Sequence, residues 1–248
     1  MRSYALISAL LACSFVPLMG QNAATPAPSA DEVIARMVAH DAQRETAAGG
    51  YTGIRQYDLE NRQLAKHAQM VVNVASDPDG TTHFQIVSKG GWGPGNNSLR
   101  QAMDSESQIS RPSVRPMTLV TKDNYAFQMI GTALLNGRTT YVIDVVPKRQ
   151  ETYLFRGRIW VDREDYALAR IEGQLAKSPS YWIRSVRFTL EYRKSGEYWF
   201  PSLATTACEI RILGATEVNI RFVDYSPLSA SARRQPGQSL MEARYVKH

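Results

Sequence analysis

Histidines are the residues of this chain best suited to acid–base catalysis or metal binding. There are four, His40, His67, His83 and His248. If the turn at 77–80 closes a four-residue hairpin, His83 lies opposite Val74, about 23 Å along the strand from His67 at roughly 3.3 Å per residue. That separation is too large for one metal ion to be shared.

No sequence motif for catalysis or cofactor binding accompanies the histidines. The patterns C-x-x-C, H-E-x-x-H and D-x-D-x-D-G are absent, so we expect neither a metal nor a cofactor. There is no G-x-S-x-G nucleophile elbow, and the glycine-rich segment 90–95 lacks the Gly-Lys-Ser/Thr ending of a phosphate loop. The paired carboxylates Asp77/Asp79 and Glu164/Asp165 lie in expected turns, where they are solvated. We therefore expect a non-catalytic binding protein rather than an enzyme, with a small exported hydrolase as the enzymatic alternative.

The charge distribution argues against nucleic-acid binding. The chain of 248 residues has a formal net charge of +6. Its basic residues are scattered, with only small clusters such as Arg184/Arg187 and Arg193/Lys194, and there is no long basic run. These clusters indicate solvated faces, and the charge is compatible with peripheral contact with an anionic membrane.

The amino-terminal segment has the features of a signal peptide. Arg2 supplies a positive charge, the run from Ala5 to Met19 is apolar but too short to span a bilayer, and Gly20-Gln21 offers a cleavage point. We assign residues 1–20 to a signal peptide and 21–30 to a linker. These assignments predict an exported, periplasmic protein.

Two interpretations of Cys13 remain open. Leu10-Leu11-Ala12-Cys13 resembles a bacterial lipobox, which would make Cys13 a lipid anchor in the outer membrane. The apolar run continues past it, which favours a cysteine inside an ordinary signal peptide. Cys208 is the other cysteine, so the mature chain has no intramolecular disulfide, and we expect a buried, inert thiol there.

One helix precedes a long series of strands. Ser29 and Glu32 form a capping box, apolar residues follow at helical spacing from Val33 to Val38, and Gly49-Gly50 ends the helix. From Tyr51 onward the apolar period is that of strands. Asp77-Pro78-Asp79-Gly80 and Asn136-Gly137 are strong turn signals.

The remaining segments complete a single domain at 31–225. We expect a loop over 89–97, a short helix over 99–109, and ten or so antiparallel strands, with 198–200 and 205–213 as separate strands. Such closely spaced strands predict a barrel or a sandwich. Residues 226–248 are rich in Ser, Ala, Pro, Arg and Gln, which predicts a flexible tail.

The segment Arg158–Gln174 reads as a hairpin around the charged turn 162–165, whose residues we expect to be exposed. Its sequence, with Trp160-Val161-Asp162 before the turn and Arg170-Ile171-Glu172-Gly173 after it, resembles the central hairpin of the LolA/LolB-like superfamily. That superfamily includes periplasmic lipoprotein carriers and the sigma-factor regulator RseB. The resemblance extends from Tyr51 to Tyr225, and the aromatic segment 197–201 also fits it.

The resemblance implies a mainly β (α+β) fold. Its strongly curved antiparallel sheet forms an unclosed barrel, with an N-terminal helix and a lid loop or helix over the concave face. It also implies a monomer that binds lipid or lipoprotein acyl chains in lipoprotein sorting or envelope lipid handling. The alternative is an RseB-like sensor that binds envelope proteins. Because a one-residue register error reverses the two faces of a strand, the predicted cavity residues are simply the large apolar ones: Met70, Phe84, Trp92, Met103, Phe127, Met129, Trp160, Trp182 and Phe188.

Overall fold

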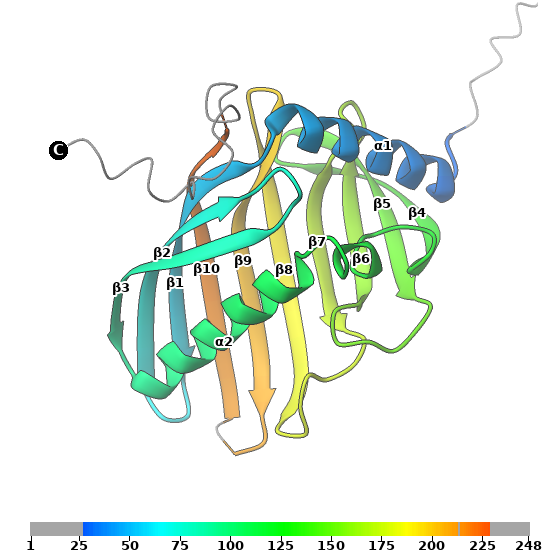
Figure 1. The fold of residues 1–248 in the computed structure, drawn as a ribbon. Helices are drawn as coiled ribbons and strands as arrows, with labels where there is room; N and C mark the ends of the chain where they lie inside the picture. The colour runs from blue at the N-terminus through cyan, green and yellow to red at the C-terminus, as the bar shows by residue number, and fades with distance from the viewer. Residues whose placement is uncertain (1–26, 213, 229–248) are drawn as a thin grey trace, which may run out of the picture.

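The computed structural model describes residues 27–212 and 214–228, which form one antiparallel sheet of ten strands with two α-helices (Figure 1). The strands are β1 Tyr51–Asn61, β2 Lys66–Ser76, β3 Thr82–Gly91, β4 Tyr125–Leu135, β5 Arg138–Pro147, β6 Phe155–Asp162, β7 Leu168–Leu175, β8 Ile183–Ser195, β9 Tyr198–Ile210 and β10 Gly214–Pro227.

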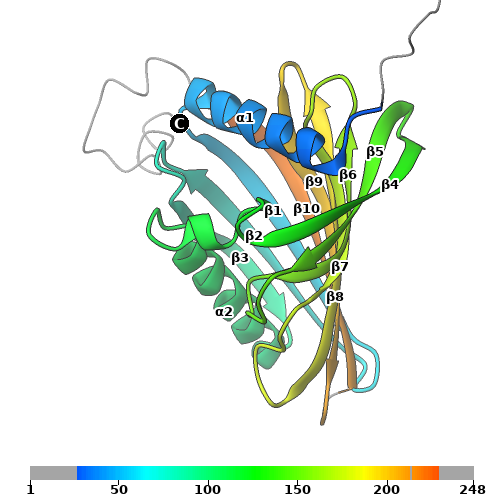
Figure 2. The ribbon, with the colours of Figure 1, turned by 90° about the vertical axis from the view of Figure 1, so that its right-hand side faces the viewer.

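The sheet is strongly curved but not closed. Its strand order is β3-β2-β1-β10-β9-β8-β7-β6-β5-β4, so neighbours in sequence pair except for β3 and β4, and β1 also pairs with β10. Strands β3 and β4 form the two edges of the sheet. Both α-helices lie on its concave side (Figure 2). The predicted unclosed barrel with an N-terminal helix and a second helix over the concave face is confirmed.

Helix α1, Ala30–Ala48, begins and ends where the sequence predicts. The Ser29 side chain accepts a hydrogen bond from the Glu32 backbone, and the Glu32 side chain accepts one from the Ser29 backbone, which completes the capping box. At the other end Gly49 is left-handed, with φ 61°, and its N–H donates to the Glu45 carbonyl.

The predicted loop over 89–97 is wrong, because a strand and a helix divide the segment between them. Strand β3 continues to Gly91, and helix α2, Gly93–Ile109, begins two residues later. Pro94 is tolerated in the first turn of α2, where a missing N–H costs nothing. Gly95 is buried beside Ala68, so this glycine provides close packing rather than flexibility. A short 3₁₀ helix, Arg115–Met117, follows α2.

The turn signals are confirmed, but one strand boundary is wrong. Asn136 and Gly137 have φ values of 50° and 79° in the two-residue turn between β4 and β5, and Gly80 has a φ of 90°. The segment 198–200 and residues 205–210 of the segment 205–213, expected as separate strands, belong to one strand, β9, which ends at Ile210. Pro201 is accommodated within it at a register shift, where it pairs with Tyr192.

The expectation that the turn at 162–165 is solvated is wrong for its first residue. The side chain of Asp162 is only 1% exposed. Arg138 donates two hydrogen bonds to it, at 2.6 and 2.8 Å, and the backbone N–H groups of Glu164 and Asp165 donate two more. A buried carboxylate is stable when it is paired and fully hydrogen-bonded in this way.

Three smaller expectations also need correction. His83 pairs with Ala75, one residue from the expected Val74, and the imidazoles of His67 and His83 each form a hydrogen bond with a nearby aspartate. Ser29 and Ala30, expected in the linker, cap and begin α1. The end of β10 includes Ser226 and Pro227, which pair with β1. The expected signal peptide, Cys13 and most of the expected tail lie outside the described residues.

Candidate ligand-binding trough

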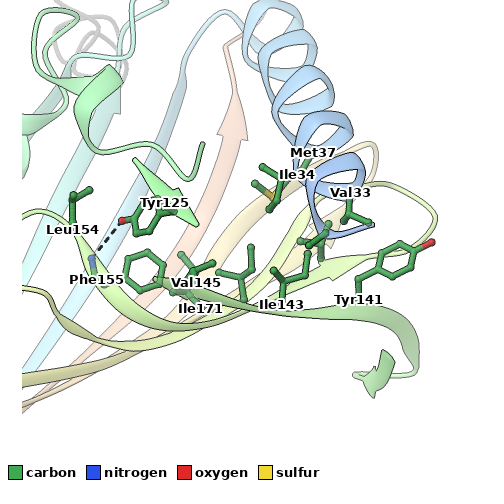
Figure 3. Packing of buried hydrophobic residues seen from close by; sticks show 13 residues of the cluster. Val33, Ile34, Met37, Tyr125, Tyr141, Ile143, Val145, Leu154, Phe155 and Ile171 are labelled. Atoms are coloured by element: carbon green, nitrogen blue, oxygen red, sulfur yellow. Dashed lines mark hydrogen bonds between the residues drawn. The ribbon is translucent and has the colours of Figure 1, made fainter. Parts of the chain in front are cut away.

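One half of the concave face is covered by α1. Its residues Val33, Ile34 and Met37 point toward the inner face of β4–β7, and all three are at most 3% exposed (Figure 3). On the sheet, Ile143 and Val145 beneath them are fully buried. Burying such side chains contributes about 1.5–3 kcal/mol each. This half is a close-packed core.

The other half is covered by α2. Leu99 and Met103 of the helix are 2% and 3% exposed and belong to a second cluster with Leu59, Met70 and Val72 on β1 and β2. Phe84, Ile86 and Trp92 pack against this cluster while remaining partly exposed. The two buried clusters share no residue.

Between the two clusters lies a strip of apolar and small residues on β8, β9 and β10. It consists of two cross-strand rows, Leu190–Ala204–Ile220 and Phe188–Thr206–Val218. All six residues are half-buried, whereas the corresponding residues below α1 are fully buried. We call these six residues the central strip. It lies on the concave face between the two helix-covered clusters, and we call this part of the concave face the trough.

An ion pair holds α2 against the sheet at the edge of this trough. The guanidinium of Arg55 on β1 donates two hydrogen bonds to the carboxylate of Glu106 on α2, at 2.7 and 2.8 Å. It lies between the rings of Phe84 and Phe222, whose centroids are 5.1 and 5.0 Å away, and it also donates to the Tyr225 hydroxyl. The Arg55 side chain is only 5% exposed. We call the Arg55–Glu106 pair the latch.

Electrostatics keep the Arg55 guanidinium of the latch charged. Burial alone would lower the pKa of Arg55, but the hydrogen bonds and charge of Glu106 outweigh burial and raise that pKa above its ordinary value. Burial raises the pKa of Tyr57, Tyr225 and Cys208, so these groups beside the latch and the central strip remain neutral at physiological pH. The trough therefore combines an apolar floor with one fixed cation and its partner.

The structure places seven of the nine predicted cavity residues on the concave side. Met70, Phe84, Trp92 and Met103 belong to or pack on the α2 cluster, and Phe127, Met129 and Phe188 pack on the α1 cluster. Trp160 lies on the convex face, where Arg170 stacks on its ring. Trp182 precedes β8 and is 55% exposed, in edge contact with Tyr181. Whether any of the nine contacts a ligand stays a prediction.

Sequence reasoning missed the latch and most of the central strip. A signal for Arg55 was present, because it shares the inward parity of Tyr57 and Leu59 on β1 and is therefore a charge on an apolar face. No comparable signal marked Ala204 or Thr206. Small residues can be assigned to a binding surface only after the structure shows that they lie on the concave face between the two clusters.

The described residues hold no group of three or more side chains suited to a metal ion. Among the helices of residues 27–212 and 214–228, none has the length and apolar character needed to cross a membrane.

A family model, described as a family of unknown function (DUF5686), matches residues 81–226. The chain belongs to this family. The match begins just before β3 and ends in β10, so it includes α2 and the whole central strip of this DUF5686 protein. No curated protein matches the chain.

Several solved structures are similar to this DUF5686 protein at low sequence identity. A DUF1329 family protein from Desulfovibrio piger has 12% identity and a TM-score of 0.43, over 86% of this chain and 96% of its own. A LolA superfamily protein from Nitrosomonas europaea has 8% identity and a TM-score of 0.39, over 84% and 97%. A protein described as an outer membrane lipoprotein-sorting domain from Vibrio parahaemolyticus has 12% identity and a TM-score of 0.39, over 84% and 95%. The superfamily that the sequence resembles is thus among the matches.

Proposed function

We propose that this protein is an exported, non-catalytic binding protein that holds lipid or lipoprotein acyl chains against the central strip, in lipoprotein sorting or envelope lipid handling. The observation that supports this proposal is the half-buried apolar floor between two fully buried clusters. An apolar surface of this kind in water needs either a lid or a ligand. A flexible acyl chain fits because it offers only apolar surface, and each buried CH₂ contributes about 0.8 kcal/mol.

Neighbouring threonines on β9 allow a matched test. Thr206 lies on the concave face in the central strip, and Thr205 lies on the convex face, where it pairs with Thr189 and donates to Asn219. Both are half-buried. Replacing either with aspartate adds the same charge to the same strand, on opposite faces of the sheet.

The measurement is titration of delipidated protein with a fluorescent fatty acid. We expect wild-type protein to bind the probe, Thr206→Asp to bind it at least about tenfold more weakly because a carboxylate in an apolar site loses its hydration, and Thr205→Asp to bind it like the wild type. Circular dichroism confirms that both variants are folded. If the wild-type protein fails to bind the probe, the acyl-chain proposal is wrong, and the trough would more naturally accommodate a protein partner.

A further inference from the structure

The convex face of the sheet carries a hollow on the side opposite the trough. It has a volume of about 720 Å³ and extends over β5–β9. Most of its lining residues alternate with the buried residues of the same strands, so their side chains point to the face opposite both helices. Among them are Asp144, Arg156, Arg158, Gln174 and Arg187.

Two facing glycines shape the floor of this hollow. Gly157 on β6 pairs directly with Gly173 on β7, and both line the hollow. A Cβ atom on Gly157 would overlap the carbonyl oxygen of Glu172, so only glycine allows the two strands to approach so closely. The side chains around this pair stand above a floor of bare backbone.

The carboxylates in the hollow are already paired. Asp144 accepts a hydrogen bond from Arg158 at 2.8 Å, and Glu172 accepts one from Arg170 at 3.1 Å. These carboxylates are therefore not free to neutralise other cations nearby.

Two other guanidiniums in the hollow have no such partner. Within the described part of the chain, Arg156 and Arg187 form no ion pair or side-chain hydrogen bond, although both line the hollow. They occupy one cross-strand row with Gln174 between them, since Arg156 pairs with Gln174 and Gln174 pairs with Arg187. Two strand spacings separate the arginines by about 9–10 Å at the backbone. Side chains of that length can converge above the Gln174 amide.

We propose that this hollow is a binding site for a phosphate group, held between the guanidiniums of Arg156 and Arg187 with the amide of Gln174 beneath it. A phosphate offers several acceptor oxygens and up to two negative charges, which match two forked donors and two unpaired positive charges. The site is independent of acyl-chain binding, because it lies on the opposite face of the sheet. The phosphate can belong to a soluble phosphate ester or to a lipid headgroup.

The test measures binding of glycerol 3-phosphate by calorimetry and binding to vesicles of phosphatidylglycerol by sedimentation, each with full-length protein. The double variant Arg156→Gln/Arg187→Gln removes both guanidiniums. The control Arg193→Gln/Arg221→Gln removes the same charge from two exposed arginines that do not line the hollow. We expect the first variant to weaken binding by about tenfold or more and the control to stay within about twofold of wild type.

The ligand arms distinguish the two sources of phosphate. If glycerol 3-phosphate binds and the double arginine variant weakens that binding, the site is assigned to soluble phosphate esters. If only vesicle binding is found and the double arginine variant weakens it, the site is assigned to lipid headgroups. Equal losses in both double variants, or no binding by the wild type in either arm, would overturn the proposal. If the arginine variant does not fold, Gln174→Glu provides the test, because a carboxylate between the two guanidiniums should pair with them and displace phosphate.

Discussion

At the tip of the β6–β7 hairpin, the buried carboxylate of Asp162 is stabilised by its ion pair with Arg138. Burial alone would raise its pKa, but the hydrogen bonds from Arg138 and from the backbone of Asp165 and Glu164 outweigh burial and lower the pKa. We expect Asp162→Ala to reduce the free energy of unfolding by about 2–4 kcal/mol, because it leaves the half-buried Arg138 without its main partner. Urea unfolding at pH 7 measures this loss.

Glu164→Ala is the control for this substitution. Glu164 also contacts Arg138, at 3.0 Å, but its side chain is 81% exposed, so we expect a loss below about 0.5 kcal/mol. Because the pKa of Asp162 is lowered by folding, its ionised form contributes stability above about pH 4 and loses that contribution as the pH falls further. The difference between wild type and Asp162→Ala should therefore shrink in acid. Equal losses in the two alanine variants would contradict this account.

Asp41 on α1 is the opposite case. Burial raises its pKa to about 6, even though Arg44 lies 3.2 Å away. A carboxyl group whose pKa is raised by folding favours the native state at low pH, and this preference is lost as the pH rises through about 6. We expect Asp41→Asn to raise the melting temperature at pH 7.5 and to leave it unchanged at pH 3.5. A variant less stable than wild type at pH 7.5 would show that the Arg44 contact outweighs the cost of burial.

Among the elements, α2 is joined to β1 by one ion pair, the latch, across a sequence separation of 51 residues. Its other polar contacts with the sheet include hydrogen bonds from Asn96 and Ser107 to backbone carbonyls of β3. We expect Glu106→Gln to leave the buried Arg55 charge partly unpaired, to loosen α2, and to speed release of a bound fluorescent fatty acid several-fold. Stopped-flow displacement by excess unlabelled fatty acid measures this rate.

Asp104→Asn, at an exposed position on the same helix, is the control for the latch variant. It changes the charge of α2 equally without touching Arg55, so the release rate should match that of the wild type. Unchanged release in Glu106→Gln would mean that α2 does not gate the trough.

The elements also show how far the sequence could predict this fold. Helix α1 was predictable because its limits are set locally, by the capping box at Ser29 and the left-handed Gly49. The start of α2 was not predictable, because its glycines are typical of a loop. Only the structure shows that Gly95 packs against Ala68 on β2. Arg138 lies 24 residues from Asp162 in the sequence, and no local pattern joins them. Features set by neighbouring residues, such as helix caps, could therefore be predicted from the sequence, whereas contacts between distant segments could not.

For the whole molecule, the two separate clusters imply two levels of local stability within one sheet. The α1 cluster contains thirteen buried residues and the α2 cluster eight, and the central strip between them belongs to neither as a buried member. Regions with fewer buried apolar contacts open at lower free energy. We therefore expect amides of α2 and β3 to exchange hydrogen faster than those of β5 and β6.

Ligand binding should change this exchange pattern in one part of the molecule only. If an acyl chain lies on the central strip, a saturating fatty acid should slow exchange in α2 and in β8–β10, because binding stabilises the closed state. In strands β5 and β6 beneath α1, exchange should slow only as far as the increase in the global free energy of unfolding requires. Hydrogen exchange read by mass spectrometry measures both regions, with Thr206→Asp as the control that should lose the protection. Protection that appears instead beneath α1 would place the ligand in the wrong half of the concave face and contradict the trough as its site.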